Sequence, residues 1–309
     1  MTAPVIFLYF IGSFVLLSVL GMLAMWVDRK VTARLQFRVG PPWYQSFADF
    51  VKLTGKEVLI PAKANIFMFV FAPVLAVTAA ATAGTILLLV LTRGFGFQGD
   101  IILLLYLLTV PSLSIILGAS SSGNVLASVG LSREMKLLLG YELPFVCALI
   151  IPALMGGLTT SLSEIVKFQN GNGMNIGSFA GITGFLIAIF ALQGKIGFVP
   201  FDLAEAEAEL AGGALIEYSG ILLGLFKLAK AILLMAGPLL LIGLYFGGIN
   251  FSSFAGVIAG LLKYVLILVL FVLIKNTNPR LRIDQALRFF WGWMTLFGIT
   301  GILLAIMGW

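Results

Sequence analysis

The chain has 309 residues but no histidine, a single cysteine, Cys147, and only 10% charged residues. Histidine nitrogens and cysteine thiolates are the usual ligands of haem iron, structural zinc and iron–sulfur clusters, so the sequence excludes such a centre built by this chain alone. The single cysteine also excludes a disulfide within the chain. Any electron transfer linked to this protein must therefore take place in a partner.

Apolar residues dominate what is present. They make up 61% of the chain, and the mean hydropathy is +1.12. A helix that crosses a bilayer needs ~20 largely apolar residues. Eight stretches meet this requirement, namely 4–27, 66–92, 101–118, 137–158, 178–199, 212–246, 253–275 and 288–308. We therefore predict an all-α integral membrane protein that forms one polytopic domain over residues 1–309.

The nineteen lysines and arginines are distributed unevenly among the predicted connections. Fourteen fall in the odd-numbered connections and two in the even-numbered ones. Basic residues are retained on the cytoplasmic side of a membrane. We therefore predict that the connections of about 28–65, 119–136, 200–211 and 276–287 are cytoplasmic, and that both termini lie outside the plasma membrane. The net charge of +6 then reports topology, and no nucleic-acid partner is expected.

The first connection contains a stretch with amphipathic spacing, which we predict to form a helix from Trp43 to Val58. Lys52 and Lys56 fall largely outside its apolar face. A helix of this kind lies flat at the membrane interface. It either connects two spans or forms a platform for a soluble partner, and both interpretations stay open. The residues that approximate the apolar face are Trp43, Phe47, Phe50, Val51 and Val58.

Four acidic residues cluster after the fifth predicted span. If this segment is helical, Asp202, Glu205 and Glu209 share a face, and Glu207 lies on another side. Carboxylates this close repel one another and exchange protons more readily. An acidic connection is often only a solvated surface. However, Glu217 follows at the mouth of the sixth span, so the cluster is also a candidate entrance to a proton path.

Ionisable residues also fall inside the predicted spans, where each costs ~2.5–3.5 kcal/mol near the helix centre. They include Glu142 in the fourth span, Lys227 and Lys230 in the sixth, and Lys263 in the seventh. Lys227 and Lys230 are three residues apart and lie on nearly one face of a helix. Snorkelling to the interface or a structural ion pair is the simpler interpretation of each lysine. We retain Glu142, Lys227 and Lys230 as candidate charge-carrying residues.

Several strings, spread from residue 28 to residue 285, resemble one family: the H-type membrane subunit of respiratory complex I and of energy-converting, membrane-bound nickel–iron hydrogenases. The acidic string with the Glu-Tyr-Ser-Gly string after it is the most specific. The strings are Asp28-Arg-Lys30, Leu35-Gln-Phe-Arg-Val-Gly-Pro41, Ala48-Asp-Phe-Val-Lys-Leu53, Lys56-Glu57, Ala72-Pro73, Tyr141-Glu142, Pro200-Phe-Asp-Leu-Ala-Glu-Ala-Glu-Ala-Glu-Leu210, Glu217-Tyr-Ser-Gly220 and Asn278-Pro-Arg-Leu-Arg-Ile-Asp-Gln285.

The resemblance implies a subunit without a redox centre that joins a soluble redox assembly, here called the arm, to ion-pumping membrane subunits. By motif, coupling of redox events to proton transfer carries over to Glu142, Asp202, Glu205, Glu207, Glu209 and Glu217. Lys227 and Lys230 would balance charge deeper in the membrane. The contact with the arm carries over to Arg34, Arg38, Trp43, Lys52, Lys56, Arg280, Arg282 and Asp284.

The resemblance also implies the partners. They are a hydrogenase-like large subunit, a small subunit that carries iron–sulfur clusters, antiporter-like and small membrane subunits, lipid and, indirectly, ferredoxin. A nickel–iron site, where there is one, would belong to the large subunit.

Departures from the complex I pattern favour the hydrogenase-type branch. After Gly40-Pro41 the chain continues with Pro42-Trp-Tyr-Gln45, where quinone-using members have a longer loop. Lys227 and Lys230 stand where complex I tends to have an apolar residue and a glutamate. These differences argue against a bound quinone. They favour a ferredoxin-linked, ion-translocating complex that evolves hydrogen or reduces a sulfur compound, as a sulfane sulfur reductase does.

Three other functions stay open at this point. The chain could be the quinone-site subunit of a complex I-type NADH dehydrogenase, a secondary transporter, or a purely structural anchor. The sequence shows no inverted repeat of the kind found in many transporters. A structural anchor would keep its ion pumping when its buried charges are neutralised, so that alternative is open to experiment.

Overall fold

The computed structural model describes residues 3–204, 212–251 and 253–308, and these residues form helices and no strand. Eight helices are long and apolar enough to cross a membrane, which confirms the predicted architecture. Seven are α1 (Ala3–Leu35), α3 (Ile66–Arg93), α4 (Asp100–Ser121), α5 (Val125–Met155), α7 (Phe179–Ile196), α9 (Gly220–Tyr245) and α10 (Phe254–Thr277). The eighth joins α11 (Ile283–Leu287), the π-helical segment η3 (Arg288–Met294) and α12 (Thr295–Met307).

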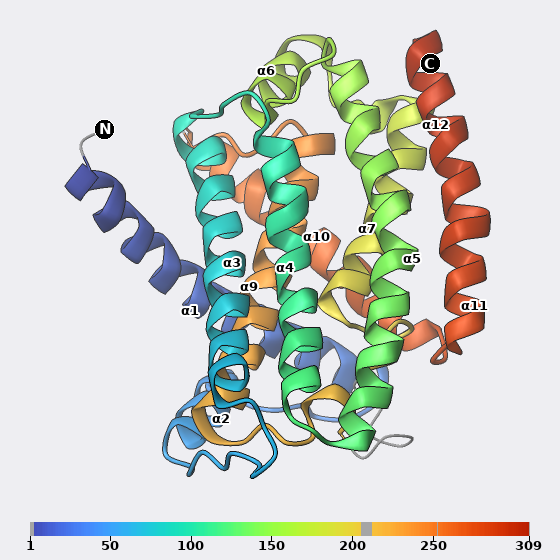
Figure 1. Cartoon of the computed structure of the whole chain (residues 1–309). Helices are drawn as coiled ribbons and strands as arrows, with labels where there is room; N and C mark the ends of the chain where they lie inside the picture. The colour runs from blue at the N-terminus through green and yellow to red at the C-terminus, as the bar shows by residue number, and fades with distance from the viewer. Residues whose placement is uncertain (1–2, 205–211, 252, 309) are drawn as a thin grey trace.

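Shorter elements lie at the two ends of the bundle. The amphipathic helix α2 (Gln45–Thr54) lies between α1 and α3, at the end where α4 connects to α5 (Figure 1). The helix α6 (Leu162–Asn172) and the 3-10 turn η1 (Asn175–Gly177) lie at the opposite end, with the C-terminus. A second 3-10 turn, η2 (Gly213–Leu215), precedes α9. We call these the α2 end and the α6 end.

Local sequence signals fix where several spans begin and end. The side chains of Asn65, Asn124, Ser178 and Ser253 each accept a hydrogen bond from a backbone N–H in the first turn of α3, α5, α7 and α10, respectively. Such caps satisfy donors that the helix itself leaves unpaired. At the other end of α7, Gly197 adopts a left-handed conformation with φ of 68°, which favours glycine and stops the helix.

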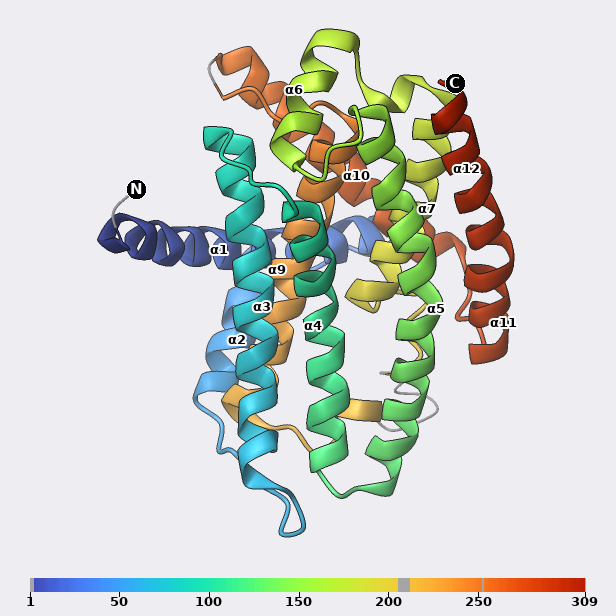
Figure 2. The same cartoon turned by 45° about the horizontal axis from the view of Figure 1, so that its top comes forward.

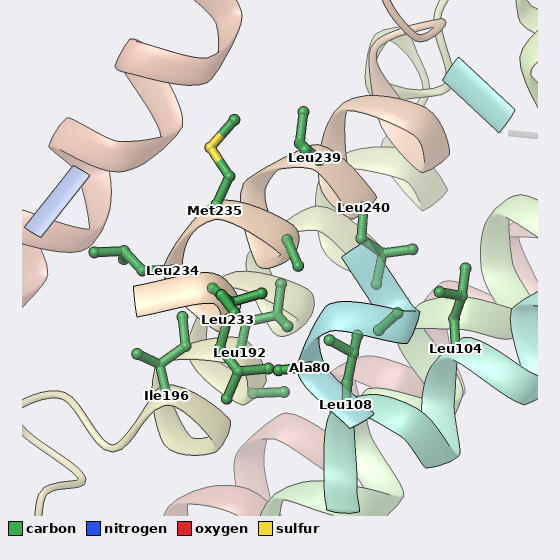
Figure 3. Packing of buried hydrophobic residues seen from close by; sticks show 14 of the residues in the cluster. Ala80, Leu104, Leu108, Leu192, Ile196, Leu233, Leu234, Met235, Leu239 and Leu240 are labelled. Carbon is green, nitrogen blue, oxygen red and sulfur yellow. The ribbon is translucent and has the colours of Figure 1, made fainter. Parts of the chain in front are cut away.

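The helix α9 forms the centre of the bundle, and 83% of its most apolar window is buried. Leu233 and Leu240 of α9 pack beside Leu192 of α7 and Leu108 of α4 (Figure 3). By contrast, only 22% of the C-terminal span is buried, and it lies at one edge of the bundle (Figures 1 and 2). The helix α1 lies at the other edge and is strongly inclined to α3, α4 and α5 (Figure 2). The apolar outer faces are therefore left for lipid or other membrane subunits.

Two predicted connections prove shorter than expected. Helix α5 begins at Val125, so Arg133 and Lys136 lie inside a helix rather than in a connection of 119–136. The cap at Asn124 starts the helix twelve residues before the apolar stretch 137–158. Hydropathy did not indicate this start, since it reports the part of a helix inside the membrane and not the helix end. Glu142 would be in the first turns of a helix over the predicted span 137–158, but it lies in the middle of α5. Similarly, α1 continues to Leu35, beyond the predicted end of the first span.

The sixth apolar stretch contains a break that hydropathy did not reveal. Gly212 and Gly213 both have positive φ angles, of 112° and 60°, and α9 begins only at Gly220. Glycine adopts this conformation at no steric cost, so the pair turns the chain before the membrane helix starts. The prediction of one helix over 212–246 is corrected accordingly. Glu217 lies in the turn between η2 and α9.

The amphipathic helix is shorter than predicted, and its inner face differs. It spans Gln45–Thr54 rather than Trp43 to Val58. Leu53 is buried, and Phe47 and Phe50 pack against the core. Trp43 and Val51 are about 60% and 65% exposed, so they do not belong to the face that packs on the bundle. The buried face has the spacing 47, 50 and 53, which follows the helical repeat more closely than the predicted set.

Candidate functional site

A buried ion pair joins α7 to α5 and α4. The Lys195 Nζ lies 2.7 Å from Glu142 Oε2 and 2.6 Å from Thr109 Oγ1. The Thr109 hydroxyl also lies 3.1 Å from Glu142 Oε1. The Lys195 side chain is only 1% exposed, against 24% for Glu142. Three spans therefore meet at one charged, hydrogen-bonded group inside an apolar bundle.

Aromatic rings surround the ammonium of Lys195. It lies 4.6 Å from the centre of the Phe145 ring and 5.1 Å from that of Tyr141. The Tyr141 hydroxyl in turn donates to Ser112 at 3.1 Å. Ring faces attract a cation, so they partly replace the water that Lys195 has lost. Removing one member of a buried ion pair leaves an uncompensated charge, at a cost of about 3–5 kcal/mol.

Lys195 is the principal residue that sequence reasoning missed. The topology prediction needs Lys195 among the fourteen basic residues of the odd-numbered connections, although it lies within the stretch 178–199 predicted as the fifth span. Its position inside a predicted span could have identified it, because an ionisable residue within a membrane helix is costly unless it has a partner. The partner is Glu142, which the sequence did single out.

A cavity of about 90 Å³ lies beside this ion pair, between α4, α5, α7 and α9. We call it the central cavity. It is large enough for a few water molecules, and its lining combines apolar side chains with charged ones. The charged residues that line it are Lys195, Lys227, Lys230, Glu134 and Asp202. The structure thus brings three predicted residues, Asp202, Lys227 and Lys230, around one space with Lys195 and Glu134.

Asp202 is not part of a helix, contrary to the arrangement considered for the acidic segment. It is held by Arg280, whose Nη2 donates to Asp202 Oδ2 at 2.8 Å. The backbone N–H of Leu281 donates to the carbonyl oxygen of Pro200 at 3.2 Å. The connection between α10 and α11 is therefore fastened to the start of the acidic segment. Arg280, predicted to contact the arm, already contacts a residue of the central cavity.

The rest of the acidic segment, Glu205, Glu207 and Glu209, lies outside the described residues. The described residues on either side of it are close together, because the N–H of Ala214 donates to the carbonyl oxygen of Ala204 at 3.1 Å. Ala214 in turn lies against α5, where a Cβ built on Gly130 would come within 2.5 Å of the Ala214 nitrogen. A glycine at position 130 is thus what allows η2 to approach α5.

Glu217 lies at the α2 end and not beside Glu142. It accepts a hydrogen bond from the side-chain amide of Asn124, the residue that caps α5. Its neighbour Tyr218 stacks on Phe69 with ring centres 4.1 Å apart, and burial raises the pKa of its hydroxyl. Within the described residues, no hydrogen bond or ion pair links Glu217 to the Lys195–Glu142 pair. The predicted path between them would need water or the acidic segment.

The residues predicted to contact the arm are exposed. They are Arg34, Arg38, Trp43, Lys52, Lys56, Arg280, Arg282 and Asp284. The two connections they belong to meet, because Asn276 of α10 donates to Thr32 of α1 at 3.1 Å. Phe37 lies between Arg34 and Arg38, is fully exposed and has a positive φ of 58°. Sequence reasoning did not select Phe37, since a phenylalanine beside an apolar span looks like part of that span.

An ion pair fastens α2 to α1. Arg29 Nη1 lies 2.7 Å from Asp49 Oδ2, and Gln45 Nε2 donates to Asp49 Oδ1 at 2.8 Å. Partial burial raises the pKa of Asp49, but the hydrogen bonds from Arg29 and Gln45 and the charges of Arg29 and Lys52 outweigh it, so the pKa lies below its ordinary value. Among the described residues, no group of three or more His, Cys, Asp or Glu could hold a metal ion.

Comparisons with known proteins agree with this architecture over nearly the whole chain. The family model described as NADH dehydrogenase matches residues 8–306. The H-type subunit of the NADH-quinone oxidoreductase from Geobacillus thermodenitrificans is 33% identical over 310 residues, covering 95% of this chain and 92% of that protein. Subunit 8 of the Thermus thermophilus NADH-quinone oxidoreductase is 34% identical over 299 residues, covering 90% and 81%.

A solved structure has the same fold along nearly the whole chain. The chain superimposes on one from the membrane-bound sulfane sulfur reductase, an archaeal respiratory membrane complex, with a TM-score of 0.88. The two are 30% identical, and the match covers 97% of this chain and 99% of the other. The chain therefore belongs to the NADH dehydrogenase family and is the H-type membrane subunit of a complex I-type or related multisubunit respiratory complex.

Proposed function

We propose that this subunit anchors the arm of a ferredoxin-linked, ion-translocating complex and couples the redox reaction of that arm to ion transfer in the membrane. The observation that carries the proposal is the buried Lys195–Glu142 pair at the edge of the charged central cavity. Buried ion pairs contribute little net stability, so a charged cavity in a membrane bundle points to a role in moving charge. The arm itself would contain the iron–sulfur clusters and any nickel–iron site.

The proposal assigns the described residues distinct parts. Asp202, in the lining of the central cavity, and Glu142, through its ion pair with Lys195, would exchange protons there, while Lys195, Lys227 and Lys230 keep the total charge near balance. Glu217 would take part from the α2 end. The charged cavity and the hydrogen bond from Arg280 to Asp202 support this assignment, because a residue of the cavity wall then contacts a residue proposed to bind the arm.

The test compares two buried ion pairs in the whole complex, reconstituted into sealed vesicles. The double variant Glu142→Gln, Lys195→Met removes both charges of the proposed site. The control Asp28→Asn, Lys275→Met removes a pair of equal length, 2.7 Å, that joins α1 to α10. We expect the first variant alone to lower the number of ions moved per electron. Unchanged coupling in the first variant would make its pair structural and contradict the proposal.

The similar proteins at 33–34% identity are NADH-quinone oxidoreductases, and they favour a second candidate, a quinone-reducing complex. The similar solved structure is a sulfane sulfur reductase. Purified complex supplied with reduced ferredoxin should release hydrogen or reduce polysulfide without added quinone. Turnover that requires an added quinone would reject protons and polysulfide as the terminal acceptors and would support a quinone-reducing complex.

A further inference from the structure

A second cavity, of about 40 Å³, lies between α1, α2 and α9. We call it the α2 cavity. Arg29 and Asp49, the pair that fastens α2 to α1, lie in its wall. The Ser46 hydroxyl in the same wall is buried and has no hydrogen-bond partner within the described part of the chain. An unpaired buried hydroxyl costs free energy, so a polar or charged group that enters this cavity and hydrogen-bonds to Ser46 would be stabilised there.

Lys227 lines both the α2 cavity and the central cavity. In this it differs from the other two lysines of the central cavity. Lys195 is bound to Glu142, and the Lys230 Nζ donates to the carbonyl oxygen of Gly197 at 3.1 Å. Lys227 has no hydrogen bond or ion pair with any residue that the structure describes. The side chain of Lys227 is exposed, in contrast to that of Lys195, so no contact within the described residues fixes its ammonium in either cavity.

Each of the two cavities that Lys227 lines also has an aspartate in its wall. Asp49 in the α2 cavity is paired with Arg29 at 2.7 Å, and Asp202 in the central cavity is paired with Arg280 at 2.8 Å. A carboxylate has two oxygens and can accept from more than one cation. The lysine side chain is a compact charge on a flexible four-carbon stem. A rotation of this stem would transfer a positive charge from one aspartate to the other.

We propose that the ammonium of Lys227 has two alternative positions. It pairs with Asp49 in one state of the complex and with Asp202 in the other. The inference rests on the proposed function. Movement of α2, on which Asp49 lies, would then change the charge in the central cavity without any proton passing through Lys227. The interfacial helix is thereby linked electrically to the site of coupling, and Ser46 offers the ammonium an additional acceptor.

The first experiment compares Lys227→Met with Lys136→Met in the reconstituted complex. Lys136 is an exposed lysine of α5 that lines neither cavity, so its variant removes the same charge elsewhere. We expect Lys227→Met to lower the ions moved per electron by about twofold or more, with the arm still bound. Equal ratios in the two variants would overturn the proposal.

The second experiment restores the charge chemically. The native cysteine, Cys147, is buried, so Lys227→Cys can be made in a Cys147→Ser background. An aminoethyl thiosulfonate reagent converts the new cysteine into a side chain that ends in an ammonium, and a methyl reagent gives a neutral one. We expect only the aminoethyl reagent to restore coupling. Restoration by both reagents, or by neither although mass spectrometry shows complete modification, would contradict a role of charge at this position.

The third experiment separates the two positions. A cationic reagent should modify Lys227→Cys more slowly when Asp49→Asn is added and also when Asp202→Asn is added, because each carboxylate attracts the cation. Slowing by only one of them would confine the charge to one cavity and contradict the two-position proposal.

If the Glu142→Gln, Lys195→Met variant loses coupling and Lys227→Met does not, this inference fails while the proposed function stands. Normal coupling in both would reject the proposed function itself.

Discussion

At the scale of single residues, the Lys195–Glu142 pair predicts that the stability losses of its two single variants are not additive. Lys195→Met leaves Glu142 as an unpaired carboxylate, and Glu142→Gln leaves an almost fully buried ammonium. Each single variant should lose about 3–5 kcal/mol, whereas the double variant should lose far less, because no unpaired charge remains. Thermal unfolding of the detergent-solubilised complex measures the three values. Additive losses would show that the two side chains do not act as a pair.

Asp49 gives a prediction for pH. Its pKa is lowered in the folded protein, so its contribution to holding α2 is fully present above the ordinary value of ~3.9 and is lost as the pH falls through the lowered value. A spin-label distance between α1 and α2 should therefore stay constant from neutral pH to about 5. In Arg29→Met, which removes the main partner of Asp49, the distance should broaden at a higher pH. An unaltered profile would show that this pair does not hold α2.

Sequence reasoning located residues unevenly at this scale. Glu142 and Lys230 could be selected because a charge inside an apolar stretch is visible from the letters alone. Lys195 has the same signal but lies near the helix end, where hydropathy cannot separate a buried charge from a loop charge. Its role became visible only when α4, α5 and α7 brought Thr109, Glu142 and Lys195 together.

At the scale of elements, close approach between segments replaces the hydrophobic driving force that is absent between helices in lipid. Gly130 illustrates the requirement, because a side chain there would collide with the backbone of Ala214 in η2. Gly130→Ala should displace η2, and with it one end of the acidic segment, at a cost of about 1–3 kcal/mol. Gly171→Ala is a fitting control, since nothing lies within 4 Å of the Cβ built on Gly171.

The displaced turn should also affect function. If the acidic segment takes part in coupling, Gly130→Ala should lower the ions moved per electron while the Gly171→Ala complex remains normal. Chymotrypsin cleavage near Tyr218, whose ring is buried against Phe69, reports whether η2 has moved. A displaced turn with normal coupling would argue that the position of the acidic segment is unimportant.

Element boundaries show where sequence periodicity is informative. The number of spans follows from hydropathy, because a bilayer requires a minimum apolar length. The starts of α5 and α9 do not, because Asn124 and the Gly212–Gly213 pair act through backbone geometry. The Glu217 turn was therefore assigned to a helix, although its glycines were visible in the sequence.

At the scale of the whole molecule, charged residues of the α2 end and of the bundle centre line two cavities that share Lys227. The Arg29–Asp49 pair lies in the wall of the α2 cavity, Lys227 lines both cavities, and Asp202, paired with Arg280, lines the central cavity with Lys195, the partner of Glu142. The family could be identified from sequence strings, but this arrangement in space could not. It depends on α9 crossing the centre, so that one face of it meets α2 and another meets α7.

The final prediction concerns attachment of the arm at the α2 end. Arg34, Phe37 and Arg38 are exposed together there, and a fully exposed aromatic flanked by cations is typical of a binding anchor. Phe37→Ala should weaken retention of the arm by roughly 2 kcal/mol, or about thirtyfold. Arg34→Glu with Arg38→Glu should release the arm from membranes at moderate salt.

The control is Lys167→Glu, which reverses an exposed charge on α6 at the opposite end (Figure 1). Co-purification of the arm with each variant at several salt concentrations measures retention. Charge reversal should show the greater salt dependence, because screening weakens exposed ionic contacts, while the loss in Phe37→Ala should persist at all salt concentrations. Equal retention in all variants would place the arm on another surface, and coupling would then have to reach the central cavity by a path that bypasses α2.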